Sequence, residues 1–81
     1  MALSRIVESR IEEIYVAYDL LAESNDTCWV RQRDIAELVS YRQSELSKTL
    51  DILIALGEFE RYEVHTSHVR YKHVGCCTHE D

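Results

Sequence analysis

The side chains best suited to recognising another molecule by hydrogen bonds lie in the stretch "RQSELSK", residues 42–48. Arg42 and Gln43 are of the types that make paired hydrogen bonds to guanine and adenine, and Glu45 could accept from cytosine or simply repel phosphate. This chemistry indicates contact with DNA base edges, although the start of an ordinary solvated helix would have the same composition. The candidates in this stretch are Arg42, Gln43, Ser44, Ser47 and Lys48.

Cations before and after this stretch suit contact with phosphate. Arg31 and Arg33 precede it, and each could instead be a surface charge offset by Asp34 or Glu37. Phosphate contacts position a protein on a duplex without specifying its sequence. A second group, which could reach the backbone or the minor groove or could form only a polar turn, consists of His65, Ser67, His68 and Arg70.

The C-terminal segment "GCCTHED" raises the separate question of a metal site. Cys76, Cys77 and His79, with His73 nearby, are of the types that bind zinc. Neighbouring cysteines point apart in a strand, however, and the segment lacks the C-x-x-C spacing of common zinc sites. We therefore expect no metal and no other cofactor, and we expect residues 76–81 to form a frayed tail.

The cysteine count and the hydropathy pattern indicate the cellular compartment in which the protein is expected. Three cysteines, an odd number, do not indicate a disulfide framework, so reduced thiols are expected, with Cys28 packed as a small hydrophobe. No run of about 18 apolar residues exists, and acidic side chains occur where a signal peptide would be apolar. These features predict a cytoplasmic protein that does not contact a membrane.

Composition argues against an enzyme. The 81 residues contain no Gly-rich phosphate loop, no nucleophile elbow and no H-E-x-x-H motif, and they leave little room for a pocket. We expect no catalytic activity and no small-molecule substrate. Hydrophobic residues at 46% and charged residues at 30% are typical of one small globular domain.

The formal net charge of -6 is unevenly spread along the chain. Residues 1–30 carry two basic against six acidic side chains, whereas residues 31–57 carry four of each. Net negative charge weakens non-specific attraction to phosphate, but it does not prevent a local basic face.

Apolar residues at helical spacing predict a helix from about residue 4 to residue 22, with Ser4 as its N-cap. A second apolar set, Tyr15, Val16 and Leu20, lies off the main stripe. Because one small domain cannot easily cover both faces, we expect this second set to form the interface of a homodimer. The main stripe consists of Ile6, Val7, Ile11, Ile14, Tyr18 and Leu21.

Two shorter helices are expected on either side of the polar step "SYRQS". The first runs from about 31 to 39, and the second runs from about 44 to 56, with Ser44 as a candidate N-cap and Gly57 at its end. The apolar "CWV" at 28–30 is too short for an independent strand. The two helices are expected to bury Ile35, Leu38 and Val39, and Leu46, Leu50, Leu53 and Ile54.

Beyond Gly57 the apolar period changes to two and predicts a β-hairpin over residues 58–74, with the four residues "HTSH" at its tip. Trp29 and the tyrosines fall on or beside apolar faces, so we expect them in the core rather than stacked on bases. The sequence thus predicts an α+β domain over residues 1–75, with three helices followed by a two-stranded hairpin.

This order of elements resembles the winged helix-turn-helix transcription regulators of the MarR and ArsR type over about residues 29–74. The piece "DIAELV" is similar to the family's second helix, "RQSELSKTLDILIALG" resembles its recognition helix, and "EFERYEV…VRYKHV" resembles its wing. The chain departs from the pattern where Arg31 replaces a common Ser or Thr, where Glu58 replaces a common leucine, and where Ser40 and Tyr41 replace the turn glycine.

The resemblance implies a small sequence-specific DNA-binding transcription regulator that acts as a homodimer on double-stranded DNA. Its recognition helix, about residues 44–56, would enter the major groove, and its wing, residues 58–74, would contact the backbone or the minor groove. The alternative, kept open by the acidic net charge, is a winged helix that serves as a protein–protein interaction module without DNA binding.

Overall fold

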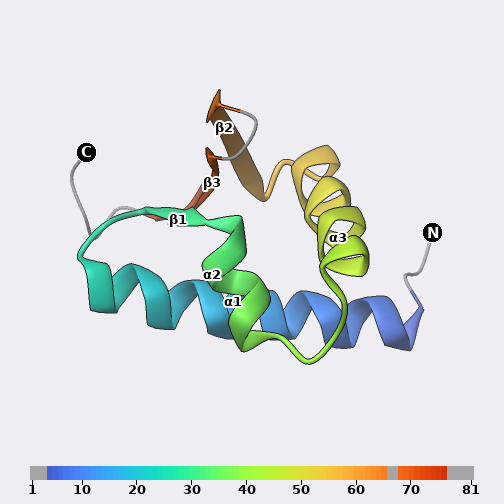
Figure 1. The fold of residues 1–81 in the computed structure, drawn as a ribbon. Helices are drawn as coiled ribbons and strands as arrows, with labels where there is room; N and C mark the ends of the chain where they lie inside the picture. The colour runs from blue at the N-terminus through green and yellow to red at the C-terminus, as the bar shows by residue number, and fades with distance from the viewer. Residues whose placement is uncertain (1–3, 66–67, 77–81) are drawn as a thin grey trace.

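The computed structural model of the protein describes residues 4–65 and 68–76, so the candidates Ser67, Cys77 and His79 lie outside the described residues. The described chain has the α+β composition that the sequence predicts, with three helices and three strands (Figure 1). In chain order the elements are α1 (Arg5–Asn25), β1 (Trp29–Arg31), α2 (Gln32–Leu38), α3 (Gln43–Ala55), β2 (Phe59–His65) and β3 (His68–His73).

The sheet has three antiparallel strands in the order β1-β3-β2, not the two strands that the sequence predicts. The additional strand is β1, in which Trp29, Val30 and Arg31 lie opposite residues 70–72 of β3. A strand of three residues is too short to show a periodicity in its sequence. It forms because the edge of β3 that faces away from β2 offers backbone N–H and C=O groups for pairing. The expectation that "CWV" is too short for an independent strand is therefore correct only in the absence of that edge.

Helix α1 begins as predicted and ends later than predicted. The Ser4 hydroxyl accepts a hydrogen bond from the Val7 N–H at 3.2 Å, which confirms the N-cap. The helix continues to Asn25 and stops at Asp26, whose left-handed backbone (φ 54°) is tolerated by Asp and Asn more readily than by most residues. The first three residues of "ESNDT", residues 23–25, are thus helical, although their polar composition suggested a break in the helix.

The core lies between α1, α3 and the inner face of the sheet. Ile14, Tyr18 and Ile35 are buried as predicted, whereas Ile6 and Leu38 are exposed, which contradicts their predicted burial. Helix α2 has only seven residues, and Ile35 is the one that it buries fully, while the partly buried Ala36 packs against the core beside it. The other buried apolar residues include Ala17, Ala22, Val30, Leu46, Leu50, Leu53, Phe59 and Tyr71.

Helix α3 begins and ends one residue earlier than the predicted range of about 44–56. Its N-cap is Arg42, which makes no capping hydrogen bond with its side chain, and Ser44 already lies inside the helix. The helix stops before Gly57, which has the positive φ of 79° that glycine adopts without steric cost. Thr49 is buried as well, and its hydroxyl donates to the Glu45 carbonyl at 2.8 Å, which satisfies it.

A disulfide joins Cys28 to Cys76, so the expectation of reduced thiols is wrong for these two residues. The start of β1 and the end of β3 are neighbours because the two strands are antiparallel. The chain then turns after β3, where the Cys76 N–H donates to the His73 carbonyl at 2.9 Å. This turn brings the Cys76 Cα within 6.1 Å of the Cys28 Cα. Cys76 therefore belongs to the domain and not to a frayed tail.

Reduction of the disulfide should destabilise the protein. The cross-link spans 48 residues, and the loss of its constraint on the unfolded chain corresponds to about 4 kcal/mol in the free energy of unfolding. Urea unfolding of the wild-type protein with and without a dithiol reductant measures the change. The matched control is the Cys28→Ala/Cys76→Ala variant, which should be insensitive to the reductant. Equal stability of the oxidised and fully reduced wild type would contradict this expectation.

Candidate nucleic-acid interface

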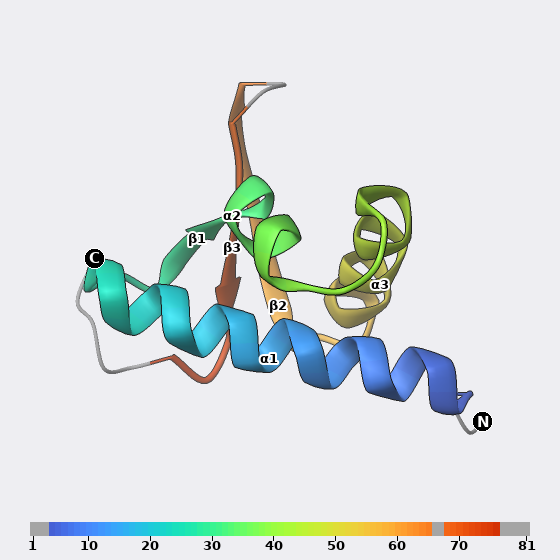
Figure 2. The same cartoon turned by 60° about the horizontal axis from the view of Figure 1, so that its bottom comes forward.

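The starts of α2 and α3 and the β2–β3 hairpin all point to one side of the molecule. In Figure 2, α1 lies along the bottom, and α2 and α3 both begin on the side turned away from it. The hairpin projects toward the same side (Figure 2). The three elements that the sequence made candidates for DNA contact therefore share one side of the fold.

The first residues of α3 are exposed and without partners. The side chains of Arg42, Gln43 and Ser44 make no hydrogen bond and no ion pair with the other residues that the structure describes. Their donor and acceptor groups face solvent and can bind an external group without first breaking an internal bond. This is where the structure places the predicted base-contacting residues.

The next turn of α3 is tied back to the protein. Glu45 accepts from Arg10 of α1 at 3.0 Å and lies 3.8 Å from Lys48, so its carboxylate is already engaged by two cations. The Arg10 guanidinium also lies over the Tyr41 ring, 5.4 Å from its centre. Repulsion of phosphate by Glu45 is thereby reduced, and the Lys48 charge is partly offset.

Gln32, which no sequence pattern singles out, connects three elements. Its Nε2 donates to the Ser47 hydroxyl of α3 at 2.7 Å, and its Oε1 accepts from the Tyr71 hydroxyl of β3 at 3.1 Å. Burial raises the pKa of Tyr71, which keeps the phenol protonated and able to donate. Ser47 is therefore occupied in positioning α3, although its hydroxyl proton and its second lone pair are still available for an outside contact.

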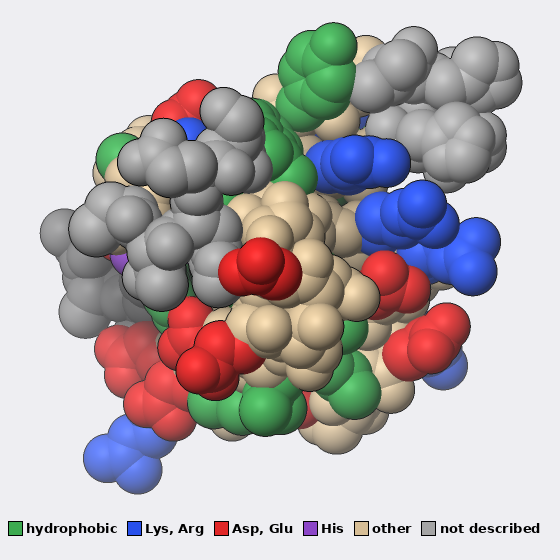
Figure 3. Space-filling view, turned by 90° about the vertical axis from the view of Figure 1, so that its left-hand side faces the viewer, with side chains coloured by type: hydrophobic (Ala, Val, Ile, Leu, Met, Phe, Trp, Pro, Cys, Tyr) green, Lys and Arg blue, Asp and Glu red, His purple; other side chains and the backbone are tan. Residues whose placement is uncertain are grey.

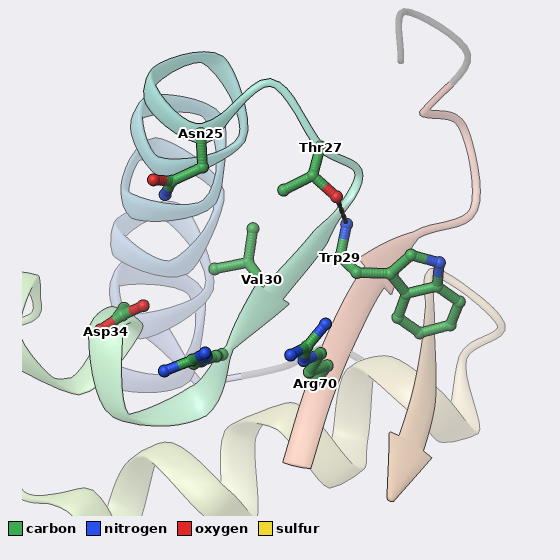
Figure 4. A pocket seen from close by; sticks show the side chains of 7 residues that line it. Asn25, Thr27, Trp29, Val30, Asp34 and Arg70 are labelled. Carbon is green, nitrogen blue, oxygen red and sulfur yellow. Dashed lines mark hydrogen bonds between the residues drawn. The ribbon is translucent and has the colours of Figure 1, made fainter. Parts of the chain in front are cut away.

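Arg31 and Arg70 are directly opposite each other on β1 and β3. They line a pocket of about 490 Å³ that also contains Thr27, Trp29 and Asp34, with the Arg70 side chain standing over the sheet (Figure 4). Like charges directly opposite on a sheet repel each other, and neither arginine has an ion pair among the residues described. Their charges favour an anion beside them, and the Asp34 carboxylate in the same lining offsets part of this effect.

The structure says less about the other residues predicted to contact DNA, which are Arg33, His65 and His68. Arg33 is exposed and lies 3.9 Å from Asp34, a surface pair of the kind that contributes little energy. His65 and His68 are paired across the hairpin, and their side chains lie outside the described residues.

The predicted dimer residues lie on two different faces of α1. Val16 and Leu20 are 61% and 55% exposed, and with the half-exposed Leu38 of α2 they line a shallow groove. Tyr15 instead packs inward, with its ring centre 5.5 Å from that of Phe59. Its hydroxyl donates to Glu58 at 3.1 Å, and burial with this bond raises its pKa to about 12. Tyr15 therefore does not share an exposed surface with Val16 and Leu20.

No protein family model, no curated protein and no solved structure matches this chain. Within residues 4–65 and 68–76, no helix is long and apolar enough to cross a membrane. The function must therefore be inferred from the surfaces described above.

Replacement of Gln32 by leucine should lower the free energy of unfolding by about 1 to 3 kcal/mol, because the buried Tyr71 hydroxyl loses its acceptor. Urea unfolding measures the change. The matched control is Gln43→Leu, which alters an exposed amide without partners and should change stability by less than about 0.5 kcal/mol. The Gln32→Leu/Tyr71→Phe variant should recover part of the loss. Equal stability of the two single variants would rule out this role for Gln32.

Proposed function

We propose that the protein is a small sequence-specific DNA-binding transcription regulator with the winged helix-turn-helix arrangement. The proposal rests on the start of α3, where Arg42, Gln43 and Ser44 are exposed and unpartnered. This end of α3 lies on the side of the fold toward which the hairpin projects (Figure 2). Helix α3 would enter the major groove, and the β2–β3 hairpin would contact the backbone or the minor groove. The three helices and the antiparallel sheet are compatible with this arrangement.

The charge distribution bears on affinity. The net charge is -6, and few cations are available to release counterions, so non-specific binding at physiological salt should be weak, with a Kd of about 10⁻⁴ M. Specific binding must then come from base contacts, each good bidentate pair contributing about 1 to 3 kcal/mol. The unpartnered Arg42 and Gln43 are the side chains suited to that task.

The regulator would act as a homodimer in the cytoplasm. The groove formed by Val16, Leu20 and Leu38 is an apolar surface on the side of α1 that the core does not cover. Two copies joined there could place their α3 helices in successive turns of the major groove, as helix-turn-helix dimers do. In a reducing cytoplasm the Cys28–Cys76 bond would depend on the local redox conditions.

Arg42→Ala should reduce both affinity and sequence preference, because it removes a base contact, whereas Arg31→Ala should weaken binding to all sequences alike. Each variant is titrated against duplexes selected from a randomised pool and against scrambled duplexes at two salt concentrations. The matched control is Arg5→Ala, which removes an exposed charge from the start of α1 and should leave binding nearly unchanged.

The alternative is a protein–protein interaction module that does not bind DNA. It is favoured by the same apolar groove and by the acidic residues Glu12 and Glu13 that border it. Failure of the wild-type protein to bind any duplex from the randomised pool, even at low salt, would favour this alternative over the regulator.

The homodimer is tested by replacing Val16 and Leu20 together with glutamate. The variant should sediment as a folded monomer, because two carboxylates would be desolvated in the contact. The matched control is Leu56→Glu, which places a charge on an equally exposed leucine at the end of α3 and should leave the dimer intact. A wild-type protein that sediments as a monomer at high micromolar concentration would exclude the homodimer.

A further inference from the structure

The outer face of the sheet combines cations with aromatic rings. Side chains alternate between the two faces of a strand, and Val30 and Tyr71 point into the core. Their neighbours on β1 and β3 therefore lie on the opposite, solvent-facing side. Those neighbours are Trp29, Arg31, Arg70 and Lys72, and Tyr62 of β2 joins them because it is paired with Arg70.

The register arranges these residues in two rows across the strands. The first row consists of Arg31, Arg70 and Tyr62, and the second consists of Trp29, Lys72 and Glu60. The two rows are separated by about 7 Å along the strands, since each residue advances the strand by about 3.3 Å. Each row thus presents one aromatic ring and at least one cation.

The two rings are neighbours on the solvent side. The ring centres of Trp29 and Tyr62 are 5.9 Å apart, and Tyr62 is 57% exposed. The Lys72 ammonium lies 5.8 Å from the centre of the Trp29 ring. Figure 4 shows the Trp29 indole turned away from Val30 and lying over the strands. The expectation that Trp29 and the tyrosines belong to the core is therefore wrong for Tyr62 and only partly right for Trp29.

The cations of this face are not neutralised by the protein. In the described part of the chain, Arg31, Arg70 and Lys72 have no ion pair, whereas Arg10, Arg33, Lys48 and Arg61 are each paired with a carboxylate. Figure 3 shows Lys and Arg side chains gathered along the right-hand edge of the molecule, with acidic side chains just below them and others toward the lower left. A chain of net charge -6 thus keeps three adjacent cations free on one surface.

We propose that this outer sheet face, consisting of Trp29, Arg31, Tyr62, Arg70 and Lys72, binds single-stranded nucleic acid. Unpaired bases would stack on the exposed rings, and the phosphates between them would lie near the cations. A duplex hides the faces of its bases, so only an unpaired strand can use both the rings and the charges. The proposal does not rest on the duplex-binding function: both would use Arg31 and Arg70 for phosphate, but only duplex binding needs the base contacts of Arg42 and Gln43 at the start of α3.

The test uses the fluorescence of Trp29, the only tryptophan in the chain. A thymidine oligonucleotide of about a dozen nucleotides should quench it on binding. Three phosphate contacts predict that log K falls with log salt concentration with a slope of roughly -2, and Lys72→Ala should reduce that slope by about 0.7. The corresponding uridine oligomer distinguishes RNA from DNA as the strand bound.

Matched variants separate stacking from charge. Tyr62→Ala should weaken binding by about 5- to 150-fold, whereas Tyr62→Phe, which keeps the ring, should bind like the wild type. Arg42→Ala should leave single-strand binding unchanged even where it abolishes duplex binding, so failure of one proposal is distinguishable from failure of the other.

Several outcomes would overturn the proposal. The first is that the oligonucleotide neither binds nor quenches the fluorescence of Trp29 at low salt. The second is that a folded Tyr62→Ala variant binds the oligonucleotide as well as the wild type does. The third is that a poly-glutamate peptide binds as tightly as the oligonucleotide. The last outcome would show a general anion surface or an acidic protein partner. Thermal unfolding confirms that each variant is folded, and Lys72→Ala provides an independent test if Tyr62→Ala is not.

Discussion

The side-chain amide of Gln32 fixes α3 relative to the sheet, because it is hydrogen-bonded to Ser47 of α3 on one side and to Tyr71 of β3 on the other. Its two polar groups are both used, one by Ser47 and one by Tyr71. Among the described residues, no buried side-chain polar atom lacks a partner. A satisfied polar network in a small core specifies one arrangement, since any shift of α3 against β3 would leave a buried group unpaired. The exposed start of α3 and the outer sheet face are therefore held in a fixed mutual position by the same residue.

The other end of the domain is fixed by interactions that converge on Cys28. Its carbonyl accepts from the buried Tyr18 hydroxyl of α1 at 2.6 Å, and its sulfur is bonded to Cys76 beyond β3. These bonds hold the three-residue strand β1 between α1 and β3. Without β1 the outer face of the sheet would lose Trp29 and Arg31. The composition of that face therefore depends on the disulfide and the hydrogen bond at Cys28. Gln32 follows directly after β1, which links the two fixed points through the backbone.

Features that depend on local sequence could be predicted, and features that depend on distant pairing could not. Ser4 and Gly57 mark helix ends through the chemistry of single residues, and Leu46, Leu50 and Leu53 repeat at the period of a helix. The strand β1 has no period, and the Cys28–Cys76 bond joins residues that only the sheet brings together. The side on which Tyr62 lies follows from its register with Arg70, and the imperfect alternation of "EFERYEV" does not fix that register. The exposure of Arg42 and Gln43 agreed with the helix start expected there, whereas the role of Gln32 required the positions of α3 and β3.

The acidic net charge would not oppose nucleic-acid binding at either proposed surface, because the charge is separated in space. Glu8, Glu12, Asp19 and Glu23 share the exposed side of α1, turned away from the core, whereas the free cations of the sheet lie on the far side of that core. The molecule measures 34 × 25 × 21 Å, and the Debye length at physiological ionic strength is about 8 Å. The carboxylates of α1 are thus largely screened from a strand on the outer sheet face. What such a strand would experience is the local charge of Arg31, Arg70 and Lys72, offset in part by Glu60 opposite Lys72. The acidity of α1 would mainly reduce non-specific attraction to the rest of the surface.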